Sequence, residues 1–190
     1  VIAPISDPPT VEDPYTPEEI AALCQAGTSP SAGINWDAYL VDCPTLADYR
    51  LFQDPTEPRS GANPGGTPYD MTTPLFSDYA QKDRFVHIPP GQQAVYNDTA
   101  GFEFPVGTII SKTFTFGHDV RAPGERGDDV VETRLLIRRA DGWKGRAYTW
   151  NDARTEARLA LGGGSKDVAW IAADGEMRDT TYQIPNTAQC

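Results

Sequence analysis

The stretch VVETRLLIRRADGWKGRAYTW, residues 130–150, decides the fold class of this chain. Both of its halves are rich in β-branched and aromatic residues, which favour strands. Between them lies Asp141-Gly142, a pair that supplies the positive φ of a tight connection. The stretch therefore predicts a β-hairpin, and a second hairpin is predicted to close at Asp174-Gly175.

Other segments rich in β-branched and aromatic residues lie on both sides of residues 130–150, and each is bounded by Gly, Pro, Asn or Asp. The expected strands cover residues 84–88, 93–96, 102–104, 108–116, 130–139, 143–150, 168–172 and 176–184. Many short strands with frequent turns predict a mainly β fold, an antiparallel β-sandwich or barrel. Between the two hairpins, NDARTEARLAL (151–161) has helical spacing, so a helical turn or two is expected there, ended by GGGS.

Short helices are expected before the strands. Residues 1–15 are rich in proline and predict an extended linker, which leaves residues 16–190 as a single β-rich domain. Thr16-Pro17-Glu18-Glu19 combines an N-cap, a proline at the first helical position and a capping-box glutamate, which predicts a helix to about residue 26. A second short helix or turn is predicted from Thr45, and residues 53–68 are expected to form a surface loop. The apolar face expected for the second helix consists of Leu46, Tyr49 and Phe52.

Charge and hydropathy exclude two classes of partner. The 190-residue chain has a formal net charge of −11 and no cluster of basic residues, which argues against nucleic acid. No window approaches the roughly 20 apolar residues that a membrane helix needs. A cationic protein partner fits this charge, and so does a surface that only keeps the protein in solution.

The cysteines point to an oxidising compartment. Cys24 and Cys43 flank a short, turn-rich stretch and are predicted to form a disulfide, which would stabilise the fold by about 3 kcal/mol. A periplasmic or extracellular location follows, either as a free mature chain or anchored at the outer membrane through a removed N-terminal segment. Cys190 is left over, and we expect its partner to be another chain, a lipid or a cofactor.

Lys112 is the candidate site residue that the strand pattern singles out. Alternation along residues 108–116 places it on the same face as Ile110, Phe114 and Phe116. An ammonium group among apolar side chains is costly unless it is paired, so an inward lysine indicates a site. The other reading is that Lys112 lies on an edge strand and extends to solvent.

Other chemistry-bearing patterns are weak. The two histidines, His87 and His118, lie in no metal-binding motif, and residues 124–129 (GERGDD) fit a solvated acidic turn better than a calcium loop. No nucleophile or phosphate-binding motif is present, which favours a protein that is not an enzyme. The four tryptophans could form a glycan-binding face if they are exposed, or belong to the core.

Four segments together resemble an uncharacterised family of exported bacterial proteins. They are TPLFSDYAQKDRFVHIPPG (73–91), FEFPVGTIISKTFTF (102–116), ETRLLIRRADGWKGRAYTWND (132–152) and YQIPNTAQC (182–190). In that family the last segment continues into a C-x-x-C-H haem-attachment motif, and some members are fused to a quinoprotein sugar-dehydrogenase-like domain. PVGTIISKTF (105–114) is also similar to cytochrome P460, where a lysine that would match Lys112 is cross-linked to haem.

The resemblance implies a non-catalytic extracytoplasmic β module of a c-type cytochrome system. Its partner would be a redox protein or a fused cytochrome or quinoprotein domain. The given sequence contains only the first cysteine of the motif, so no cofactor is expected in it, and haem c is expected only if the chain continues beyond Cys190. In that case Cys190 and Lys112 would contact the haem. The alternatives are a lysine-cross-linked haem enzyme and a glycan-binding β-sandwich.

Overall fold

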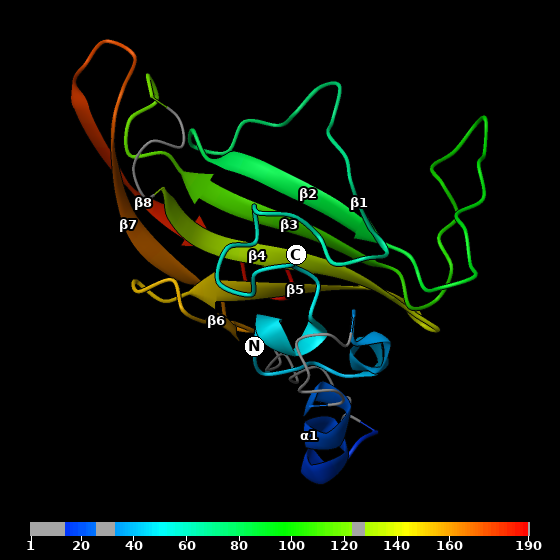
Figure 1. The fold of residues 1–190 in the computed structure, drawn as a ribbon. Coiled ribbons are helices and arrows are strands. Elements are labelled where there is room, and N and C mark those ends of the chain that lie inside the picture. The colour runs from blue at the N-terminus through cyan, green and yellow to red at the C-terminus, as the bar shows by residue number, and fades with distance from the viewer. Residues whose placement is uncertain (1–13, 26–32, 123–127, 190) are drawn as a thin grey trace, which may run out of the picture.

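The structure is a computed structural model that describes residues 14–25, 33–122 and 128–189 (Figure 1). Six strands form one antiparallel sheet in chain order, and two more form a separate hairpin. The sheet consists of β1 (Gly66–Pro68), β2 (Gln81–His87), β3 (Ile109–Phe116), β4 (Asp129–Arg139), β5 (Gly142–Trp150) and β6 (Ala157–Leu159). The hairpin consists of β7 (Gly164–Ile171) and β8 (Met177–Ile184). The predicted mainly β, antiparallel, sandwich-like fold is confirmed, and the sheet is open because its edge strands β1 and β6 do not pair with each other.

Both predicted hairpins are present. Arg139 pairs with Gly142 where β4 turns into β5, and Gly142 has a φ of 130°. Ile171 pairs with Met177 where β7 turns into β8, and Gly175 has a φ of 88°. Glycine reaches these backbone angles without the steric penalty that a side chain would impose. For this reason the two Asp-Gly pairs were enough to predict where both hairpins turn.

Several local predictions are wrong. Residues 151–161 form a turn followed by the short strand β6, which pairs with β5, instead of a helix. GGGS does not end an element, because β7 begins within it at Gly164. Residues 93–96 and 102–104 contribute only an isolated bridge between Val95 and Glu103, and the predicted loop 53–68 ends in strand β1. In each case pairing with a neighbouring strand, or its absence, outweighs local propensity.

The two faces of the sheet are covered by different parts of the chain. One face packs against the N-terminal helices and carries Phe85, Ile109, Leu135 and Tyr148. The β7–β8 hairpin crosses one end of the opposite face, where Phe114 and Phe116 pack against it (Figure 1). Elsewhere on that opposite face, Arg84, Lys112 and Leu136 line a cavity.

The helices begin and pack largely as predicted. Helix α1 (Pro17–Gln25) starts with the expected capping box, because Thr16 and Glu19 exchange backbone-to-side-chain hydrogen bonds of 2.8 and 3.2 Å. The short helix η2 (Leu46–Tyr49) follows Thr45, and its predicted apolar face is buried. An additional short helix, η1 (Trp36–Leu40), was not predicted. Helix η1 contacts β4, and η2 contacts β6.

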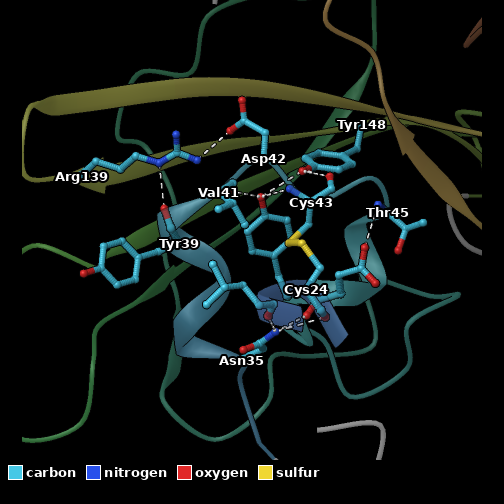
Figure 2. Close-up of a disulfide and its surroundings, with 12 residues drawn as sticks. Cys24, Asn35, Tyr39, Val41, Asp42, Cys43, Thr45, Arg139 and Tyr148 are labelled. Carbon is cyan, nitrogen blue, oxygen red and sulfur yellow. Dashed lines mark hydrogen bonds and ion pairs between the residues drawn. A yellow bond between two sulfur atoms is a disulfide. The ribbon is translucent and has the colours of Figure 1, made fainter. Parts of the chain in front are cut away.

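The predicted disulfide between Cys24 and Cys43 is present, with Cα atoms 5.5 Å apart (Figure 2). Tyr148 of β5 donates a 2.8 Å hydrogen bond to the backbone oxygen of Cys43. Asp42 accepts from Arg139 at 2.7 Å and from Arg146 at 2.6 Å. The disulfide-linked segment is therefore fixed to the sheet by polar contacts as well as by the core.

Candidate functional site

A cavity of about 390 Å³ lies on the face of the sheet opposite the helices. Ile110, Lys112 and Phe114 of β3 form its floor together with residues of β2, β4 and β5. One wall is the segment that leads into β2, which contributes Met71 and Phe76 among other residues. We call this cavity the basic pocket because Lys82, Arg84, Lys112 and Arg134 line it.

Three of these cations stand in a row across adjacent strands. Lys112 of β3 is paired in register with Arg84 of β2 on one side and with Arg134 of β4 on the other. Residues that lie directly opposite each other in an antiparallel sheet have Cβ atoms only about 5 Å apart. This cationic row of Arg84, Lys112 and Arg134 is a local concentration of positive charge in a chain of net charge −11.

The two arginines of the row have carboxylate partners, whereas Lys112 has no such partner among the described residues. Arg84 contacts Asp70 at 2.9 Å. Arg134 donates to Glu132 at 3.0 Å through Nε and to the hydroxyl of Tyr182 at 3.1 Å. Within the described part of the chain, the ammonium of Lys112 has no hydrogen-bond acceptor, and it lies 4.9 Å from the centre of the Phe114 ring.

The environment disfavours the charged form of Lys112. Burial, and then the charges of Arg134, Arg84 and Lys82, lower the pKa of its ammonium below the usual value of 10.5, while Glu132 acts in the opposite direction. Burial next to Arg84 and Arg134 lowers the pKa of Lys82 as well. An anion in the basic pocket would act against both shifts, since an opposite charge favours the charged form.

A bulge in β4 explains how Glu132 comes to be buried beside the pocket. The register shifts between Phe114 and Thr115, which pair with Glu132 and Val130, so Val131 is an extra residue. Val131 and Glu132 consequently both lie on the side of the β7–β8 hairpin, where Tyr182 donates a 2.7 Å hydrogen bond to Glu132. Glu132 is fully buried and holds Arg134 at the edge of the basic pocket.

The structure settles where the predicted site residue Lys112 lies. It shares the pocket-lining face with Ile110 and Phe114, as strand alternation predicted. The alternative that Lys112 lies on an edge strand is wrong, because β3 is paired on both sides. Cys190 lies outside the described residues, while Gln189 next to it lines the basic pocket.

Three other cations of the pocket, Lys82, Arg84 and Arg134, were not predicted from the sequence. They could have been found by comparing the side-chain alternation of β2, β3 and β4, because in the paired sheet each of these cations lies on the same face as Ile110 or Phe114. That reading requires the register between the strands, which the sequence of each strand does not contain.

The other sites that the sequence suggested receive no support from the described residues. The one group with metal-ligand geometry there is Cys24, Cys43 and Asp48, and its two sulfurs are joined in the disulfide. Of the four tryptophans, Trp143 is 41% exposed, Trp36 is partly buried against the core, and Trp150 and Trp170 are buried. The structure therefore lacks the pair of exposed tryptophans that a glycan platform would use. In the acidic stretch 124–129, Asp128 is buried and contacts Arg59 at 2.6 Å, and residues 124–127 lie outside the described residues.

The basic pocket fits an anionic group better than an iron centre. Its cations suit carboxylates and its apolar floor suits a ring or alkyl group. Among the described lining residues there is no histidine or cysteine, and Met71 is the sole sulfur donor. Of the residue types that commonly ligate a haem iron, the described lining holds Tyr69 and Met71 but no histidine or cysteine.

Comparison of the chain with protein-family models, curated proteins and solved structures found no match. Within the described residues, no helix has the length and apolar character to cross a membrane.

Proposed function

We propose that this chain is an extracytoplasmic, non-catalytic binding module whose basic pocket takes a ligand with an anionic group and an apolar body. The observation that carries the proposal is Lys112, a half-buried ammonium without an acceptor among the described residues, in the middle of the cationic row. Burying cations side by side costs free energy, and a bound anion offsets that cost.

The surroundings of Lys112 specify the rest of the ligand. Phe114 and Ile110 line the floor beside the ammonium, and Leu136 lies on the neighbouring strand. Leu75 and Phe76 at the rim are 83% and 71% exposed. An aromatic or alkyl body would cover these side chains and remove apolar surface from water, which favours binding by about 25 cal/mol per Å² buried.

For the biological setting, we propose a periplasmic or extracellular module that accompanies a redox protein of the c-type cytochrome class or a quinoprotein domain. The sequence resemblance supports this setting, and the disulfide is compatible with an oxidising compartment. The net charge of −11 suits a cationic redox partner, because complementary charge speeds encounter. A lysine-cross-linked haem enzyme is the weaker candidate, since the described lining of the pocket offers Lys112 but no histidine for iron.

The binding proposal is tested with three ligands that differ only in charge: 4-phenylbutyrate, 4-phenylbutan-1-ol and 4-phenylbutylamine. Calorimetric titration should show the carboxylate binding more tightly than the alcohol, and the amine not at all, because the cationic row repels it. Replacing Lys112→Met should weaken binding of the carboxylate roughly tenfold to a hundredfold, since a hydrogen bond to a charged group contributes about 1.5–3 kcal/mol.

Lys144→Met is the matched control, because it removes one positive charge at a lysine paired with Asp141 outside the pocket. It should leave the affinity for 4-phenylbutyrate unchanged. Equal affinity of the three ligands, or equal loss in the two variants, would contradict the proposal.

The redox setting needs its own test. Titration of the protein with a basic c-type cytochrome should show binding that weakens as the ionic strength rises. If the two proteins do not associate even at low ionic strength, the proposed partner class is wrong, while the binding property of the pocket stands.

A further inference from the structure

The lysines of the chain differ in how their amino groups are satisfied. Lys144 is paired with Asp141 at 2.6 Å, and Lys166 with Asp152 at 3.2 Å. Lys82 donates to the backbone oxygen of Leu75. Within the described part of the chain, Lys112 is the lysine whose Nζ atom has no acceptor oxygen to donate to.

We propose that Lys112 forms an imine with the carbonyl group of an oxo-carboxylate, an aldehyde or ketone that also carries a carboxylate, bound in the basic pocket. This inference rests on the proposed function, because it names the chemical class of the pocket's ligand. It assigns Lys112 a covalent role that a simple ion-pairing residue would not have.

The neighbouring arginine can hold the carboxylate end of such a ligand. The described contacts of Arg84 run through Nη1, to Asp70 at 2.9 Å and to the backbone oxygen of Lys82 at 3.2 Å. A guanidinium has five N–H donors, so others remain for a ligand. Arg84 stands directly opposite Lys112 in the register of β2 and β3, which places an anion-binding group beside the amine.

The setting of Lys112 favours the uncharged amine that attack on a carbonyl requires. The charged and titratable groups that act on Nζ are Arg84 and Lys82 from β2, and Arg134 and Glu132 from β4. Three of them are cations. Oε1 of Glu132 accepts from Arg134 and Tyr182, while its Oε2 has no hydrogen-bond partner among the described residues. Before a ligand binds, burial together with these cations lowers the pKa of Lys112, which raises the fraction of neutral amine at a given pH. The carboxylate of the ligand pairs with Arg84, which leaves the neutral amine of Lys112 to attack the carbonyl group.

The covalent step is a condensation that needs no oxidant or reductant. The lone pair of neutral Nζ forms a bond to the carbonyl carbon, and the carbonyl π bond breaks. The oxygen takes up the two protons that the amine loses and leaves as water. The product is a carbon–nitrogen double bond between ligand and Lys112, and hydrolysis returns both partners unchanged.

The test is reductive trapping on the unmodified protein, with its other lysines as internal controls. The protein is incubated at neutral pH with 4-formylbenzoate and sodium cyanoborohydride, whose hydride converts an imine to a stable secondary amine. Peptide mapping by mass spectrometry then gives the rate of labelling at Lys82, Lys112, Lys144 and Lys166. We expect Lys112 to be labelled at least tenfold faster than Lys144 and Lys166.

Two further arms separate site-directed capture from general reactivity. Benzaldehyde, which lacks the carboxylate, should lose most of the preference for Lys112, and an excess of 4-phenylbutyrate should protect Lys112 selectively. Equal labelling of all four lysines, or equal preference with benzaldehyde, would overturn the inference. If 4-phenylbutyrate binds but Lys112 is not trapped, the imine is wrong and the binding function remains; if neither happens, both are wrong.

Discussion

Removing the charge of Lys112 should make the protein more stable. Each of the two like-charged cross-strand neighbours, Arg84 and Arg134, contributes about 0.2–1 kcal/mol of repulsion. Partial burial of an ammonium without a described acceptor adds to that cost, and its contact with Phe114 returns about 0.5 kcal/mol. Lys112→Met keeps the apolar stem of the side chain and removes the charge.

The expected result is a gain of about 1 kcal/mol in the free energy of unfolding, or a rise of roughly 2–4 °C in Tm for a domain of this size. Urea denaturation followed by tryptophan fluorescence measures it. Lys144→Met is again the control, and its effect should stay within about 0.5 kcal/mol because its ion pair is solvent-exposed. A loss of stability in Lys112→Met, or a gain no larger than in the control, would show that Lys112 is a structural residue and refute the reasoning.

Three other predictions concern the scaffold. Replacing both Cys24 and Cys43 by serine should lower the free energy of unfolding, measured by urea denaturation, by about 3 kcal/mol. An unchanged urea midpoint would mean that the disulfide does not form in solution. Burial lowers the pKa of His87 from 6.5 to about 4, so the unfolded chain takes up a proton before the native state does. Stability should then fall as the pH drops from about 6.5 to 4, and His87→Gln should lose less stability over this range than the wild type; parallel pH profiles would contradict this. In Gly66→Ala the new Cβ would lie 2.4 Å from the Cβ of Ala62 and 2.6 Å from Nδ1 of His87, which should lower the free energy of unfolding by about 1–3 kcal/mol in thermal denaturation. The control Gly162→Ala places its Cβ with no atom within 4 Å and should lower it by less than about 1 kcal/mol. Equal effects of the two substitutions would rule out the clash.

The sequence predicted those parts of the fold that local chemistry determines. The Asp141-Gly142 and Asp174-Gly175 turns located the hairpins, and the Thr16–Glu19 capping box located α1, because each depends on a few adjacent residues. The helix predicted in residues 151–161 failed for the opposite reason. Residues 157–159 pair with β5, and such a tertiary contact is not visible in local spacing.

The candidate site was only partly predictable. Alternation within one strand was enough to single out Lys112 and to place it with Ile110 and Phe114. The cationic row was not predictable, because it depends on the register of β3 with β2 and β4. The β3–β4 register includes the bulge at Val131, and no feature of the β4 sequence predicts that bulge.

The central claim is that the basic pocket takes an amphipathic anion beside Lys112. The most direct test is a titration of the ¹⁵N-labelled protein with 4-phenylbutyrate, followed by two-dimensional amide spectra. We predict concentration-dependent shifts at Ile110 to Phe114 of β3, at Arg134 to Leu136 of β4 and at residues 69–77, with the disulfide-linked helices unchanged. Shifts confined to other surfaces, or no shifts at millimolar ligand, would contradict the account.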